Sequence, residues 1–172
     1  MSRPQPNEYN PHFAPYTAMA TGESVAELIA NHSTYLLDFV AGIPEQKATL
    51  SYAEGKWTVK EVLQHVIDME RVFAYRALCL ARGETQNLPS ADQDQFALFH
   101  RSKYRAFSDI QEEFLAMRCD HNILFRSFDR TALMQEGLVN GQKSNCQSWV
   151  YNSFGHTLYH VKLLKERYGI PD

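Results

Sequence analysis

The sequence predicts an all-α protein: a four-helix bundle with additional short helices and an extended N-terminal arm. Apolar residues recur three and four positions apart in several long stretches, which is the period of an amphipathic helix. Residues typical of helix caps flank most of these stretches. No segment shows a convincing apolar–polar alternation of the kind that indicates a strand. With 172 residues and 44% hydrophobic residues, the chain is long enough to form one domain with a full core.

We expect the chain to divide into an arm, residues 1–22, and a bundle domain, residues 23–172. The arm contains Pro4, Pro6, Pro11 and Pro15. Because proline is excluded from helix interiors, we predict that the arm is extended and not helical. The aromatic residues Tyr9, Phe13 and Tyr16 suggest that it packs against the domain.

The first two helices carry capping signals at their starts. Ser24 with Glu27, and Thr58 with Glu61, have the spacing of a capping box. The first helix should end at Gly42, and the second should end near Arg82, just before a glycine. His65 and Asp68 lie beside the apolar stripe of the second helix.

The second half of the chain supplies the other two helices. A new N-cap near Ser108 and Asp109 predicts a helix that extends to about Phe128, after a shorter helix that contains His100. Residues 129–147 are polar and contain glycines, which indicates a long connection or a hairpin-like loop. We expect Ser148 to cap the last helix.

Composition excludes several classes of partner and location. The net charge of −3, without any run of Lys or Arg, argues against nucleic-acid binding. No apolar stretch approaches the roughly 20 residues that span a bilayer. The first residues lack the apolar core of a secretory signal, so we expect a cytoplasmic protein. Three widely spaced cysteines without a C-x-x-C pair are expected to be free thiols.

Three histidines form the candidate site. His156 and His160 are four residues apart in the last helix, so they lie on one face and can hold one ion together. His65, on a facing helix of the bundle, is the expected third ligand. A three-His set leaves coordination positions open for water or substrate, which is typical of catalytic metal sites. Asp68 is a candidate to accept the second ring N–H of a ligand.

The residues alone leave alternatives open. The histidines could be unrelated to one another, since an i, i+4 pair also occurs by chance. Thr157 stands where the H-E-x-x-H motif requires its general-base Glu, so metalloprotease chemistry is disfavoured. His12, His32, His100 and His121 have no neighbour at ligand spacing and are expected to be solvated or satisfied by hydrogen bonds.

Two segments resemble the DinB-like family of metal-binding four-helix bundles, the DinB/YfiT group. Residues 55–76 read GKWTVKEVLQHVIDMERVFAYR, and residues 155–160 read GHTLYH. Asp92-Gln93-Asp94 also matches, and the resemblance extends from about residue 24 to the end. It implies that His65, His156 and His160 bind a divalent metal, commonly nickel or zinc. Relatives often carry His where this chain has Tyr159, which is a second candidate for a supporting role.

The resemblance also suggests activities. Some relatives are S-transferases that use a low-molecular-weight thiol, and we expect a metal-dependent enzyme of this type acting on a small molecule. Three neutral ligands leave the metal a net positive charge, which would lower the pKa of a bound thiol or water. The alternatives are a metal-dependent hydrolase and a non-enzymatic metal-binding stress protein. Relatives are often homodimers, so a homodimer is also expected.

Overall fold

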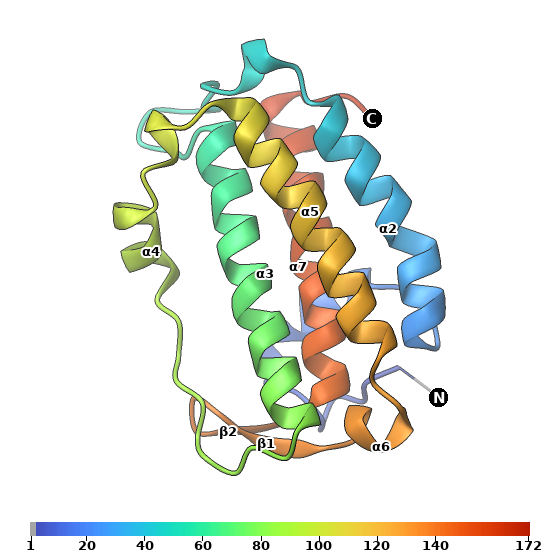
Figure 1. Cartoon of the computed structure of the whole chain (residues 1–172). Coiled ribbons are helices and arrows are strands. Elements are labelled where there is room, and N and C mark those ends of the chain that lie inside the picture. The colour runs from blue at the N-terminus through green and yellow to red at the C-terminus, as the bar shows by residue number, and fades with distance from the viewer. Residues whose placement is uncertain (1–2) are drawn as a thin grey trace.

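The computed structural model describes residues 3–172 and shows four long helices packed side by side (Figure 1). The bundle helices are α2 (Val25–Gly42), α3 (Val59–Ala81), α5 (Phe107–Arg126) and α7 (Cys146–Tyr168). Shorter elements join them: η1 (Pro11–Phe13), α1 (Ala14–Met19), η2 (Glu45–Lys47), α4 (Gln93–Phe99), η3 (Ser102–Tyr104), α6 (Arg130–Leu133), β1 (Glu136–Val139) and β2 (Gln142–Asn145). The predicted all-α four-helix bundle is confirmed. Within residues 3–172, no helix is both long enough and apolar enough to cross a membrane.

The helices follow an up-down-down-up order. In Figure 1, α2 and α7 run toward the top of the view, whereas α3 and α5 run downward. The chain therefore has to return along the whole bundle between α3 and α5, and it does so through the outer segment that carries α4. The helix α7 packs against α3 and α2, and it is buried along its first three turns.

Two of the predicted helix starts are confirmed, and one of them forms the full capping box. The side chain of Ser24 accepts a hydrogen bond from the Glu27 N–H at 3.2 Å, but the Glu27 carboxylate accepts the Glu23 N–H at 2.9 Å, so the expected box at Ser24 is not completed. Thr58 and Glu61 form a reciprocal capping box, in which the Thr58 N–H donates to Glu61 Oε2 at 2.7 Å. These caps satisfy backbone N–H groups that have no partner within the helix.

The prediction of a wholly extended arm is wrong for residues 11–19. Pro11 and Pro15 lie in the first turns of η1 and α1, where the missing proline N–H would have had no helical partner. The prolines therefore start these short helices instead of preventing them. The expected packing of the arm is present, since the ring of Phe13 lies 5.1 Å from that of Trp149.

Two other predicted starts are displaced. The helix α5 begins at Phe107, after Ala106, which provides no side-chain cap. The helix α7 begins at Cys146, because Asn145 Oδ1 accepts the hydrogen bond of the Ser148 N–H at 2.9 Å. The Ser148 hydroxyl instead donates to the Asn145 carbonyl oxygen at 2.7 Å, inside the first turn.

The segment before α7 is a true β-hairpin. Strands β1 and β2 pair antiparallel, with Val139 opposite Gln142. Asn140 and Gly141 form the turn with φ values of 51° and 71°, the geometry that an Asn-Gly turn favours. Each strand has only four residues, the apolar pair Leu138 and Val139 of β1 is consecutive, and β2 is wholly polar, so there is no apolar–polar alternation to detect. The Leu88 N–H donates to the Leu138 carbonyl oxygen at 2.9 Å, which attaches the segment before α4 to the hairpin.

The arm reaches α7 through a glycine. A Cβ atom on Gly155 would overlap the carbonyl oxygen and carbonyl carbon of Tyr16, so only glycine allows α1 to lie this close. Beside this contact, the Thr17 hydroxyl donates to Asn152 Oδ1 at 2.8 Å. These contacts make residues 11–19 part of the wall around α7.

Replacing Gly155 by Ala tests this packing. We expect G155A to lose ~1–3 kcal/mol of unfolding free energy, because the added methyl forces backbone apart in a packed region. Urea unfolding and limited proteolysis of the arm provide the readouts. G42A is the matched control, because a Cβ on Gly42 meets nothing within 4 Å. Equal stability of G155A and wild type would contradict the close approach.

Candidate metal centre

Three buried histidines converge where α3 packs on α7. His65 comes from α3, and His156 and His160 come from successive turns of α7. The Nε2 atom of His156 lies 3.2 Å from Nε2 of His65 and 3.2 Å from Nε2 of His160. All three candidate ligand atoms lie within 4.8 Å of one another, and the residues are only 4%, 4% and 8% exposed. The structure therefore brings together the three predicted ligands.

The environment keeps these imidazoles neutral. Burial is the main cause that lowers the pKa of His65 to about 4 and that of His160 to about 3. Burial, and then the charges of His160 and His65, hold the pKa of His156 well below its ordinary value. A metal ligand must be deprotonated, so near neutral pH the site is prepared for a cation.

The spacing of the nitrogens suits a metal ion. With Zn–N bonds of about 2.05 Å, two ligands of a tetrahedral ion lie about 3.3 Å apart. The two observed Nε2–Nε2 distances of 3.2 Å are close to this value, and the third pair, His65 and His160, has ligand atoms within 4.8 Å of each other. Each nitrogen of a neutral imidazole offers either one N–H or one lone pair, so three inward nitrogens can form one good hydrogen bond among themselves and leave the third without a partner. A cation resolves that conflict, so the donor set fits a divalent ion.

Asp68, a candidate for a supporting role, is hydrogen-bonded to a residue of its own helix. Asp68 Oδ1 accepts a hydrogen bond from Gln64 Nε2 at 3.0 Å, and burial raises the pKa of its carboxyl group. The Nδ1 atoms of His156 and His160 have no hydrogen-bond partner among residues 3–172. A role for Asp68 in orienting a ligand therefore stays a prediction.

Aromatic rings surround the histidines. The Tyr159 ring is 40% exposed and lies edge-on to His160, with 5.3 Å between ring centroids. Tyr16 packs edge-on against both His156 and Tyr159 at 5.3 Å, and Trp57 lies 4.9 Å from His65. Sequence reasoning gave Tyr16 and Trp57 no place at the site. The sequence offered only two indications that these rings could lie near the site: the aromatic character of the arm and the position of Trp57 just before the cap of α3.

A buried charged network lies beside the histidines in the bundle core. The Glu70 carboxylate forms an ion pair with Arg118, and both side chains are fully buried. Glu70 also contacts His121 Nδ1 at 3.1 Å and accepts a hydrogen bond from the Thr157 hydroxyl at 2.8 Å. His121 is thus satisfied inside the core, in agreement with its expected role. The Thr157 side chain is held by Glu70, so it supplies no general base to the metal centre.

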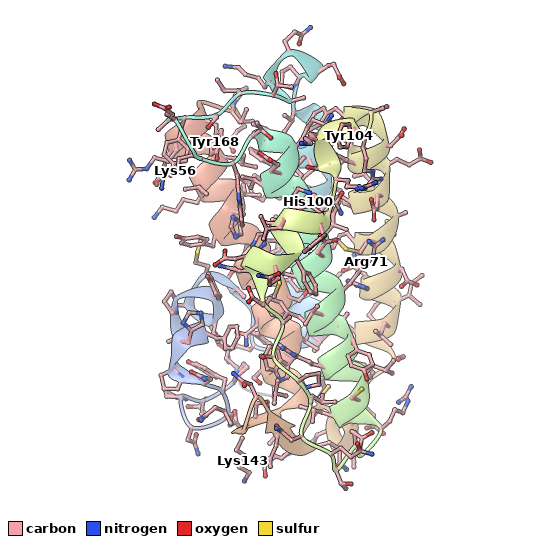
Figure 2. The ribbon with its side chains drawn as sticks, turned by 90° about the vertical axis from the view of Figure 1, so that its left-hand side faces the viewer. Lys56, Arg71, His100, Tyr104, Lys143 and Tyr168 are labelled. Atoms are coloured by element: carbon pink, nitrogen blue, oxygen red, sulfur yellow. The ribbon has the colours of Figure 1, made fainter. Side chains whose placement is uncertain are left out.

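A cavity of about 310 Å³ leads from the histidines toward the other end of the bundle. His156 lies at its edge, and its walls come from the arm, α3, the segment before α4, the hairpin and α7. Figure 2 views this side, where α4 passes His100, the hairpin lies near Lys143, and Tyr168 marks the opposite end. Of the three histidines only His156 lines this cavity, which is large enough for a small organic molecule.

Comparisons with known proteins agree with this architecture. The family model described as the DinB superfamily matches residues 28–164. A solved structure, described as "YfiT from Bacillus subtilis is a probable metal-dependent hydrolase with an unusual four-helix bundle topology", aligns with a TM-score of 0.65 at 15% identity. The alignment covers 98% of this chain and 94% of that chain. No curated protein sequence matches the chain.

Metal analysis tests the three-histidine site. We expect purified protein loaded with zinc or nickel to retain about one ion per chain, because three neutral nitrogens converge. H65A and H160A should each lower the affinity more than roughly tenfold, since loss of a supporting contact alone has effects of that size. H32A is the control, because His32 contacts Thr21 away from the site. Equal metal content in all variants, measured by elemental analysis, would rule out the site.

Proposed function

The chain belongs to the DinB superfamily, and from that premise we propose that it is a metal-dependent enzyme. His65, His156 and His160 would hold a divalent ion, with zinc and nickel the preferred choices. The proposed reaction is conjugation of a low-molecular-weight thiol with a small electrophile, in which the thiol sulfur forms a bond to carbon, the leaving group departs as an anion and the thiol proton passes to solvent. The observation that carries this proposal is the convergence of three buried, neutral imidazole nitrogens beside a cavity.

The donor set determines what chemistry is available. A divalent ion held by neutral ligands keeps its full charge and acts as a Lewis acid, which lowers the pKa of a thiol or water brought to it. Imidazole suits both zinc and nickel, and a soft thiolate is a favourable additional ligand for such ions. The three histidines would hold the ion and exclude bulk water by their burial, and His156 would border the cavity.

The surroundings of the histidines favour thiol transfer over hydrolysis. No carboxylate or cysteine belongs to the cluster of ligand groups in the described part of the chain. Thr157 replaces the Glu of the zincin motif, and its hydroxyl is committed to Glu70. Expulsion of a poor leaving group in hydrolysis generally needs a positioned acid. A thiol with a lowered pKa is already a strong nucleophile and requires no such partner.

Hydrolysis is the second candidate. It is supported by the YfiT structure, which shares the fold at 15% sequence identity and is described as a probable metal-dependent hydrolase. The same three histidines would serve, with water as the incoming group. A small molecule is the proposed substrate for both reactions. A cytoplasmic location, where such thiols are abundant, and a homodimeric state stay predictions.

A thiol panel distinguishes the two reactions. Zinc- or nickel-loaded protein is incubated with monochlorobimane and a series of low-molecular-weight thiols, and the fluorescence of the conjugate is followed. We expect at least one thiol to react more than about tenfold faster with wild type than with H160A, because loss of a ligand removes the Lewis acid. No acceleration by any thiol would remove the support for S-transfer. Metal-dependent cleavage of ester substrates in the same samples would then favour the hydrolase.

A non-enzymatic role makes a different prediction. If the metal served only to staple the bundle, the helices would unfold when it is removed. A four-helix domain of this length has a large apolar core of its own, so we expect the chelated protein to keep its helical circular dichroism. Its unfolding free energy should fall only by the binding contribution, about 2.7 kcal/mol at a metal concentration 100 times Kd, with a matching fall in melting temperature. Complete unfolding on chelation would favour the structural role.

A further inference from the structure

One buried cation lines the cavity without an acidic partner. Arg76 of α3 is only 5% exposed, and its guanidinium lies over the ring of Trp149 at 4.7 Å. Its Nη2 atom donates to the Pro89 carbonyl oxygen at 2.9 Å. No ion pair joins it to any carboxylate among residues 3–172, and burial alone lowers its pKa to about 10. It therefore stays charged near neutral pH.

The cavity around Arg76 has no negative charge of its own. Its lining residues include neither Asp nor Glu, and Arg76 is the only Lys or Arg among them. The apolar walls come largely from aromatic rings: Phe13, Phe73 and Trp149. A guanidinium presents five N–H donors in a planar fork, and one protein carbonyl uses only part of this capacity. A buried charge is costly unless it is paired, so this arrangement favours an anion in the cavity.

A second donor lies nearer the histidines. Asn152 of α7 is fully buried and lines the same cavity. Its Oδ1 atom accepts the Thr17 hydroxyl, which orients the amide, while Nδ2 has no hydrogen-bond partner in the described residues. Asn152 precedes His156 by one helical turn, so its unused donor and the metal centre share one face of α7.

The positions along the helices set the length of a ligand. Arg76 follows His65 by eleven residues in α3, which corresponds to roughly 16 Å along the axis. Trp149 precedes His156 by seven residues in α7, or roughly 10 Å. The rings connect these points, since Phe73 lies 5.4 Å from His156 and 5.5 Å from Trp149. A molecule that reaches both Arg76 and His156 must be elongated and partly apolar.

We propose that this cavity binds an elongated organic carboxylate. The carboxylate pairs with the free edge of Arg76, the apolar body lies against Phe73 and Trp149, and Asn152 Nδ2 donates to a polar atom near the other end. That end then reaches the histidines, and this last assignment rests on the proposed metal-dependent function. The carboxylate subsite itself does not require a metal.

Paired probes of equal shape test the carboxylate subsite. Binding of 4-phenylbutyrate and of the neutral 4-phenylbutyramide is measured by calorimetry on the full chain, with chelator and with zinc. Wild type should prefer the acid by at least roughly tenfold, since charge-assisted pairing with an oriented guanidinium adds to the shared apolar contact. R76M should reduce the preference to less than about twofold while it still binds the amide. R76K should retain part of the preference.

The control is R82M, because Arg82 also stacks on a ring, that of Phe128, but lies outside the cavity. It should bind both probes like wild type. Absence of acid binding, equal affinity for acid and amide, or an unchanged preference in R76M would each overturn the subsite. If acid binding required zinc and were unchanged in R76M, the carboxylate would bind the metal and not Arg76. That result would overturn the carboxylate subsite but not the proposed metal-dependent function. Failure of the proposed function is seen separately, as equal metal content in H65A and wild type.

Discussion

The buried carboxylate of Glu70 fixes the helices on which the candidate metal centre depends. It projects from α3, pairs with Arg118 of α5 and accepts the hydroxyl hydrogen bond of Thr157 from α7. Breaking a buried ion pair by removing one partner typically costs about 3–5 kcal/mol. A shift of α7 along α3 would break the Glu70 contact with Thr157. Because Thr157 directly follows His156, the same contact sets the register in which His156 meets His65.

Three consecutive residues of α7 thus have three different tasks. Gly155 lets the backbone of α1 approach, His156 enters the ligand set, and Thr157 faces the buried carboxylate. Consecutive helical residues point about 100° apart, so one turn serves the arm, the site and the core at once. The arm in return places Tyr16 against His156. The binding site is therefore built from packing that also stabilises the fold.

The helix starts and the histidine pair could be predicted from the sequence because they depend on residues close together in the chain. The capping residues of α2 and α3 depend on side chains three positions apart, and the histidine pair depends on helical spacing alone. The Asn140-Gly141 turn of the hairpin is local as well, but the attachment of β1 to Leu88 and of α1 to Gly155 depends on partners distant in sequence. Arg76 gave no signal, since a lone arginine near the end of a helix is ordinarily solvated. Its isolation from carboxylates exists only in the folded chain.

In this bundle, the candidate metal ligands and much of the cavity wall come from different parts of the chain. The histidines lie on two long helices, whereas much of the cavity wall comes from the arm, the return segment that carries α4 and the hairpin. Such connecting segments tolerate substitution and insertion far better than packed helices do. Substitutions in these segments can alter which molecule the cavity binds, while the three histidines stay unchanged. The architecture thus keeps the histidine set on fixed helices while the segments around the cavity are free to vary in sequence.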